Sequence, residues 1–171
     1  MFLATTLEII LEILILLFVL ISLGGLVSIF LIRDLRKTYK EMYRQQSRFD
    51  IELRKVANLM SKVVSSPELK GWLDLVIKEL PYQKKKQLLQ LLFDLYETID
   101  LNDEKFSYLV ETYDNLQEAR RLLDAKILLF NQKISFFPFN LYAKVMKLSK
   151  KEYYTHRSEE RRVGKECRSR W

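Results

Sequence analysis

The chain has almost none of the side chains from which catalytic and metal centres are usually built. It holds one cysteine, Cys167, and one histidine, His156, among 171 residues. Zinc sites and Ser-His-Asp triads need histidine or cysteine at defined positions, and a disulfide needs a second cysteine. We therefore expect no enzyme activity, no bound metal and no cofactor.

Glycine is also scarce. Gly24 and Gly25 lie in an N-terminal apolar run, and Gly71 is the only glycine between Arg33 and His156. Tight turns of β-sandwiches and barrels need glycine, and so do phosphate-binding loops. Leu, Lys, Glu, Gln and Arg dominate instead, and all of them favour helix. The sequence predicts an all-α protein.

The last fifteen residues, Arg157 to Trp171, differ from the rest of the chain. They read RSEERRVGKECRSRW, which matches an in-frame translation of a short-read sequencing adapter at every codon. We set them aside as a non-native tail, expected to be disordered, and expect the natural C-terminus near His156. The remaining chain has 23 Lys and Arg against 19 Asp and Glu, a mildly basic balance that does not indicate nucleic-acid binding.

Twenty consecutive residues, Ile13 to Ile32, carry no charge and read ILILLFVLISLGGLVSIFLI. At about 1.5 Å per residue, a helix of this length crosses a hydrocarbon core of about 30 Å. A buried core helix would show polar residues every turn, and a cleaved signal peptide would begin with positive charge, which residues 1–12 lack. The run predicts a single transmembrane helix.

Basic residues follow this span directly, and such residues stay on the cytoplasmic side of a membrane. We therefore expect residues 1–12 outside a bacterial inner membrane and residues 33–156 in the cytoplasm. The basic residues could also contact anionic lipid headgroups, although a topology signal alone would account for them. They are Arg33, Arg36, Lys37 and Lys40, followed by Arg44 and Arg48.

Two small residues in the span, Gly24 and Ser28, are separated by one helical turn. Such pairs allow transmembrane helices to approach closely, so a homo-oligomer is one interpretation. The other is that small residues are merely tolerated there.

Three segments of nearly equal length follow the span: Arg33–Val64, Pro67–Ile99 and Asp103–Ser135. Their short connections predict an antiparallel bundle of three long helices, closed by a short C-terminal helix after Pro138. Ser66 before Pro67 and the run Asn102-Asp103-Glu104 are helix-start signals. Pro81 should kink or break the second helix.

The first and third segments each carry an apolar seam with a period of 3.5 residues. The first seam is Leu35, Tyr39, Met42, Gln46, Phe49, Leu53, Val56, Met60 and Val63, and the third is Phe106, Leu109, Tyr113, Leu116, Arg120, Leu123, Ile127, Phe130 and Ile134. The second is Leu69, Trp72, Val76, Leu88, Leu92, Leu95 and Ile99.

Polar residues interrupt two of these seams, Gln46 in the first and Arg120 in the third. With both segments running away from the membrane, these residues and Gln83 would lie at one height and form a polar layer. Arg120 would be its hub, with Asp50 or Asp124 supplying charge. Alternatively, Arg120 reaches solvent.

Two further clusters have both a plain and a functional interpretation. We expect the run Lys84-Lys85-Lys86 to be a solvated face rather than a binding patch. We expect the aromatic run Phe136-Phe137-Pro138-Phe139 to cap the core at the end of the bundle far from the membrane. The alternative is that it is a hot spot for a partner.

The stretch Glu118–Tyr154 resembles the C-terminal signature of the LemA family. The resemblance rests on Ala119-Arg120-Arg121, Phe130-Asn131, Phe137-Pro138, Asn140-Leu141-Tyr142-Ala143 and Tyr153-Tyr154. Leu123-Asp124 stands where that pattern has a Tyr-Asn pair. The resemblance implies an anchored helical bundle of undefined biochemical role, with no catalytic residues to carry over.

We interpret the chain as a membrane-anchored interaction or scaffold protein whose bundle binds an unidentified protein partner. The alternative is a lipid-binding or membrane-organising module that uses the basic helix after the span. A hydrolase is a more distant third interpretation.

Protease added to intact spheroplasts should leave the bundle uncut, because the basic flank of the span predicts that the bundle faces the cytoplasm. An immunoblot against the bundle measures this outcome, and lysed spheroplasts are the control. Digestion from outside would contradict the predicted topology.

Overall fold

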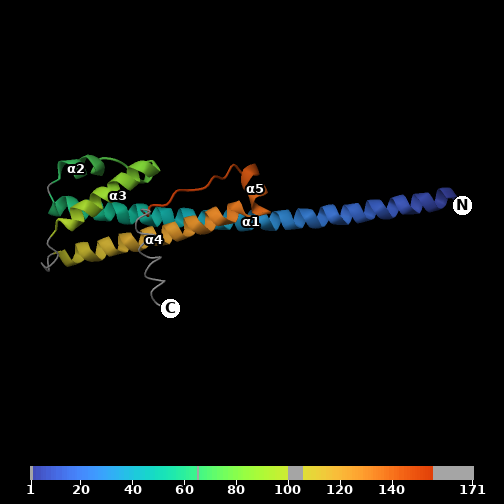
Figure 1. Ribbon diagram of the computed structural model, residues 1–171, viewed down its shortest axis with the longest axis horizontal. Helices are drawn as coiled ribbons and strands as arrows, with labels where there is room; N and C mark the ends of the chain where they lie inside the picture. Colours follow the sequence, from blue (N-terminus) through green and yellow to red (C-terminus); the bar gives the residue numbers. More distant parts are fainter. Residues whose placement is uncertain (1, 65, 100–105, 156–171) are drawn as a thin grey trace, which may run out of the picture.

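The computed structural model describes residues 2–64, 66–99 and 106–155, and every regular element among them is a helix, so the all-α prediction is confirmed (Figure 1). The predicted helix start at 102–104 and the tail 157–171 lie outside these residues. The elements are α1 (Phe2–Val63), α2 (Pro67–Leu73), a 3₁₀ turn η1 (Ile77–Glu79), α3 (Tyr82–Glu97), α4 (Ser107–Ser135) and α5 (Phe139–Val145).

Helix α1 runs without interruption for 62 residues, from the apolar run into the bundle. It contains no proline, and no glycine after Gly25, so nothing in its sequence breaks the helix at Ile32. Its N-terminal part is long and apolar enough to span a membrane. Large apolar side chains are exposed from Leu11 to Phe30, so this part of α1 packs against no other element along most of its length.

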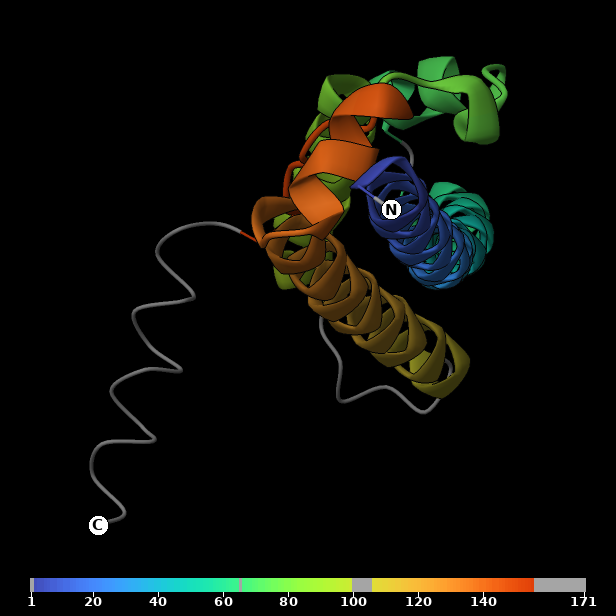
Figure 2. The same cartoon turned by 90° about the vertical axis from the view of Figure 1, so that its right-hand side faces the viewer.

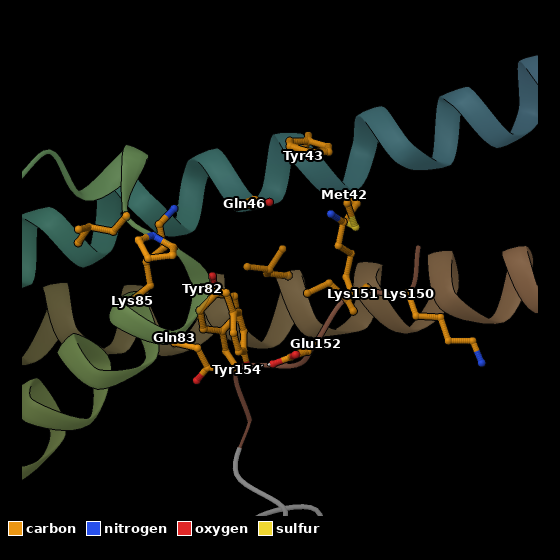
Figure 3. A pocket seen from close by; sticks show the side chains of 14 residues that line it. Met42, Tyr43, Gln46, Tyr82, Gln83, Lys85, Lys150, Lys151, Glu152 and Tyr154 are labelled. Carbon is orange, nitrogen blue, oxygen red and sulfur yellow. Dashed lines mark hydrogen bonds between the residues drawn. The ribbon is translucent and has the colours of Figure 1, made fainter. Parts of the chain in front are cut away.

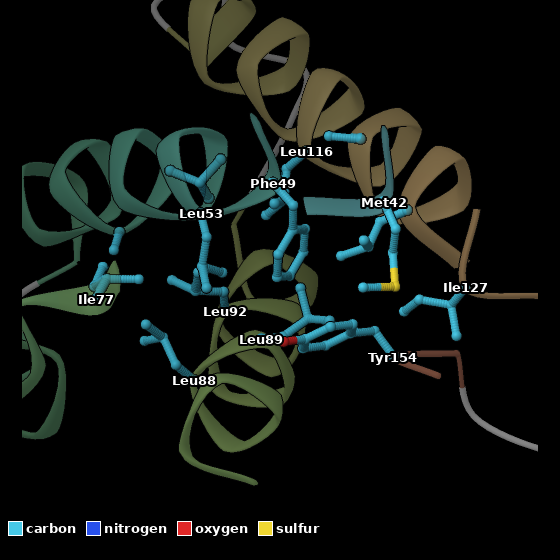
Figure 4. Packing of buried hydrophobic residues seen from close by; sticks show 14 of the residues in the cluster. Met42, Phe49, Leu53, Ile77, Leu88, Leu89, Leu92, Leu116, Ile127 and Tyr154 are labelled. Carbon is cyan, nitrogen blue, oxygen red and sulfur yellow. The ribbon is translucent and has the colours of Figure 1, made fainter. Parts of the chain in front are cut away.

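The core of the bundle is the pairing of α1 with α4 (Figure 4). The predicted seams meet there: nearly all their apolar members are buried, while Gln46 and Arg120 are half-buried and Val63 is exposed. The buried seam residues are Leu35, Met42, Phe49, Leu53, Val56, Met60, Leu109, Tyr113, Leu116, Leu123, Ile127, Phe130 and Ile134.

Helix α4 runs antiparallel to α1, which corrects the expectation that the first and third segments run in the same direction (Figure 1). Lys126 Nζ lies 3.2 Å from a Glu41 carboxylate oxygen, and Lys133 Nζ lies 2.7 Å from one of Asp34. Later residues of α4 therefore meet earlier residues of α1. We call the end at residues 33–38 the anchor end and the end at Val63 the far end.

The second segment is interrupted before α3, and Pro81 lies at this break. It has no amide hydrogen and its ring clashes with a preceding helical turn, so the second segment breaks there. The second segment consists of α2, η1 and α3, which corrects the expectation of three long helices. The predicted break at Pro81 is present, since Pro81 is the N-cap residue of α3. Beyond Pro81, α3 turns back to the far end, where Tyr96 stacks on Tyr113 of α4 with ring centroids 3.8 Å apart. The chain therefore enters α4 at the far end and returns along α1.

Two other predicted boundaries are confirmed: α2 begins at Pro67 with Ser66 as its N-cap residue, and α4 ends at Ser135, before Pro138. In the second seam, Leu69, Leu88 and Leu92 are buried as expected, whereas Val76 is exposed.

The aromatic run at residues 136–139 lies at the anchor end, where Phe139 is half-buried against the core but Phe136 and Phe137 are exposed. Phe136 is 66% exposed and Phe137 78% exposed. The expected cap at the far end is therefore wrong, because α4 runs the other way. After this run, α5 lies across the anchor end, and residues 147–155 return along the bundle toward its middle (Figures 1 and 2).

Candidate functional site

A groove of about 410 Å³ opens midway along the bundle (Figure 3). Four parts of the chain enclose it: α1, α4, the start of α3 and the C-terminal segment. Its lining residues are Met42, Tyr43, Gln46, Leu80, Pro81, Tyr82, Gln83, Lys85, Leu123, Ile127, Lys150, Lys151, Glu152 and Tyr154.

The groove combines a buried apolar floor with a polar rim. Met42, Leu123 and Ile127 are buried seam residues, so their side chains form the apolar part. Figure 3 shows Lys151 reaching across the opening toward α1, while Lys150 points away from it. The groove could therefore accept a ligand in which an apolar group lies next to a carboxylate.

The C-terminal segment that forms one wall is fixed by polar side chains of α4. Asn131 holds Lys151 from both sides: its amide nitrogen donates to the Lys151 carbonyl, and its Oδ1 accepts from the Lys151 amide, both at 2.8 Å. Two helical turns before Asn131, buried Asp124 accepts from the amides of Tyr154 (2.8 Å) and Thr155 (2.9 Å). These bonds hold a segment without regular structure against the bundle.

Tyr154 is the apolar anchor of the same wall. Its buried ring lies 4.7 Å from Phe49 and 4.8 Å from Tyr82, centroid to centroid. Burial, together with the nearby Glu152 and Asp124 carboxylates, raises the pKa of Tyr82 to about 12. The Tyr82 phenol therefore stays protonated at neutral pH and donates its hydrogen to the Tyr153 carbonyl.

A buried ion pair joins α3 to α1 beside the groove. Lys85 is 2% exposed and Asp50 8%, and the Lys85 ammonium contacts both Asp50 carboxylate oxygens, at 2.7 and 2.8 Å. It also donates to the Lys78 carbonyl at 3.3 Å. The expected solvated face is therefore wrong at Lys85, although Lys84 is exposed. Burial raises the pKa of Asp50, and the Lys85 ammonium opposes that rise.

The basic residues after the apolar run form one exposed patch on α1. Their spacing of three or four residues places them on one side of the helix. Glu41 lies in the same patch but is paired with Lys126 of α4. The patch contains all four predicted headgroup contacts and Arg44: Arg33, Arg36, Lys37, Lys40 and Arg44.

The structure brings together two of the three residues of the predicted polar layer. Gln46 and Gln83 line the same groove, from α1 and α3. Gln83 is exposed and donates to Glu152 at 3.4 Å. Arg120 is half-buried on α4 and is not among the groove's lining residues. That Arg120 is the hub of a polar layer stays a prediction.

The carboxylates expected beside Arg120 have other partners. Asp50 pairs with Lys85, and Asp124 binds the C-terminal segment. Sequence reasoning missed both roles because a lysine triplet in a helix normally faces solvent, and a segment without periodicity carries no signal of where it packs. The sequence drew attention to Asn131 in one way only, because it belongs to the Phe130-Asn131 pair on which the resemblance of residues 118–154 rests.

Among the described residues, no group of three or more His, Cys, Asp and Glu side chains could hold a metal ion. No protein-family model, no curated protein and no solved structure matches the chain.

Removing one member of the buried pair should destabilise the fold. Lys85→Met would leave the Asp50 carboxylate buried without its counter-ion, at a cost of about 3–5 kcal/mol. The double variant Asp50→Leu with Lys85→Met should recover most of this loss, because no buried charge remains. Chemical unfolding of the detergent-solubilised protein measures the difference, with the exposed neighbour Lys84→Met as control.

The cost of Lys85→Met should also depend on pH. A carboxyl with a raised folded pKa favours folding below its unfolded pKa of about 4, and that contribution is lost as pH rises through the folded pKa. Without Lys85 the pKa of Asp50 rises further, so the variant should approach wild-type stability as pH falls from neutral. A stability difference that stays constant with pH would contradict this assignment.

Proposed function

We propose that the protein is a membrane-anchored interaction module that presents its groove to a protein partner at a fixed height above the cytoplasmic membrane face. The observation that carries the proposal is the unbroken α1, which forms both the apolar run and one wall of the groove. An unbroken helix keeps its two ends at a fixed distance. Anchoring the apolar run in the membrane therefore also fixes the distance of the groove from the membrane.

The height of the groove follows from helix geometry. Met42 lies ten residues beyond Ile32, which corresponds to about 15 Å of helix, and Gln46 lies about 21 Å beyond it. The groove is thus within reach of a short segment of another membrane protein. The Glu118–Tyr154 stretch, with its resemblance to the LemA family, supports the same general picture of an anchored bundle.

The chemistry of the groove selects the partner. Its apolar floor takes a hydrophobic side chain, and the ammonium of Lys151 at the opening pairs with an acidic one. We propose a segment in which an apolar residue is adjacent to an aspartate or glutamate.

Site-specific photocrosslinking in native membranes tests this proposal. A photoreactive amino acid at Tyr43, which is exposed on the groove rim, should give a defined adduct. Lys151→Glu should abolish that adduct, because it places a negative charge opposite the partner's carboxylate.

The matched control is the photoreactive group at Tyr108, an exposed tyrosine on α4 near the far end. It should not give the same adduct. An adduct that survives Lys151→Glu, or that also forms from Tyr108, would contradict groove binding.

A second candidate function, binding of anionic lipid, is favoured by the exposed basic patch on α1. The replacement of Arg36, Lys37 and Lys40 by Gln should reduce the number of phosphatidylglycerol molecules that copurify, because each cation near the surface attracts headgroups. Native mass spectrometry counts the retained lipids. Replacing Lys62, Lys70 and Lys84, which are exposed and lie outside the patch, is the charge-matched control. Equal lipid retention in the two triple variants would rule out this function.

A further inference from the structure

The anchor end carries a group of large apolar side chains that the bundle does not cover. Phe136 and Phe137 are exposed, and Val145 at the end of α5 is 82% exposed. Leu141, one helical turn before Val145, is exposed as well. A soluble surface rarely gathers such side chains in so short a stretch, so this group needs an apolar environment.

Helix α5 has two distinct faces. Its inner face packs on the core through buried Ala143 and half-buried Phe139 and Tyr142. Its outer face presents Leu141 and Val145, with Lys144 exposed between them. An apolar face next to lysine is the composition of a helix that lies in the interface of a membrane.

One contact fixes the height of α5 relative to the apolar run. The Ser28 hydroxyl donates to the Gly24 carbonyl at 2.7 Å, which leaves the Tyr142 hydroxyl to donate to Ser28 Oγ at 2.6 Å. Ser28 lies four residues before Ile32, about 6 Å inside the run. Tyrosine is enriched at this depth, where its ring is in hydrocarbon and its hydroxyl is among headgroups.

The orientation of α5 agrees with this depth. Figure 2 views the molecule from the N-terminal side and shows α5 lying across the bundle, crosswise to α1. A helix crosswise to a membrane-spanning helix lies along the membrane plane. Lys133, the last basic residue of α4, is held by Asp34 at 2.7 Å and lies 5.3 Å from the Phe139 ring. The aromatic run is therefore tied to the start of the basic flank.

We propose that Phe136, Phe137 and the outer face of α5 insert into the cytoplasmic leaflet beside the span and form a second membrane attachment. This inference rests on the proposed anchoring by α1, but not on the groove or its partner. A single spanning helix leaves the bundle free to tilt relative to the membrane plane. An inserted α5 restricts that tilt, because the anchor end must stay against the lipid surface on the side where α5 lies.

Tryptophan quenching in vesicles of phosphatidylethanolamine and phosphatidylglycerol tests the inference with the full chain. In a Trp72→Phe, Trp171→Phe background, Phe137→Trp and Val145→Trp each place one fluorophore in the element. Both positions are exposed, so the larger ring should be tolerated, and an unchanged helical circular dichroism spectrum verifies the fold. Lipids brominated near the headgroup end of the acyl chain should quench the emission of both, because an interfacial helix lies at that depth.

Two control positions distinguish the possible outcomes. Phe93→Trp, at an exposed position of α3, lies beyond Lys85 and thus more than about 27 Å past Ile32, and should not be quenched. Leu20→Trp, in the middle of the apolar run, should be quenched by bromine deep in the bilayer.

Insertion is overturned if Phe137→Trp and Val145→Trp resist brominated lipid while Leu20→Trp is quenched. If aqueous acrylamide quenches these two variants instead, the surface is exposed to solvent. If neither quencher reaches them, a protein partner or a second copy of the chain covers the surface. If Leu20→Trp also resists brominated lipid, the proposed anchoring fails, and the insertion fails with it.

Discussion

The antiparallel packing of α4 on α1 is the constraint on which the rest of the molecule depends. The two long helices bury their seams against each other, and the other elements are attached to this pair. The ion pairs Glu41–Lys126 and Asp34–Lys133 agree with one register along the pair. That register sets which residues of α4 face the groove and places the end of α4 beside the end of the apolar run.

The sequence was sufficient to predict the elements of this pair but not their direction. An apolar stripe with a period of 3.5 residues identifies the buried face of a helix, and it does so equally well whichever way the partner runs. The direction of α4 relative to α1 depends on the segment of chain that connects the two helices. Pro81 was expected to break that segment. Whether the chain then continues in the same direction or turns back depends on how the residues around the break pack. Here Lys85 is drawn into the core by Asp50, which brings the start of α3 against the middle of α1.

The candidate site was less predictable because helices form some of its walls and a segment without regular structure forms another. Gln46 and Gln83 were noticed since they interrupt or flank regular patterns, and both line the groove. Asp124 and Asn131 stand beside the α4 seam, and their backbone partners lie in a segment with no periodicity. A hydrogen bond between a side chain and a distant backbone leaves no trace in the spacing of residues. Such bonds are visible only once the chain is folded.

The C-terminal segment connects the two proposed surfaces of the protein. It leaves α5 at Val145 and reaches the groove at Lys150. Asn131 attaches it to α4 at Lys151, and Asp124 attaches it at Thr155. Helix α5 itself is attached to α1 by the contact of Tyr142 with Ser28. A force that displaced α5 from the lipid surface would therefore act on two separate supports, α1 and the wall of the groove. Both supports include side-chain hydrogen bonds: Tyr142 with Ser28 at α1, and Asn131 and Asp124 with the backbone of the groove wall. The proposed membrane contact at α5 and the wall of the groove are for this reason linked through residues 146–149, which lie outside the helices.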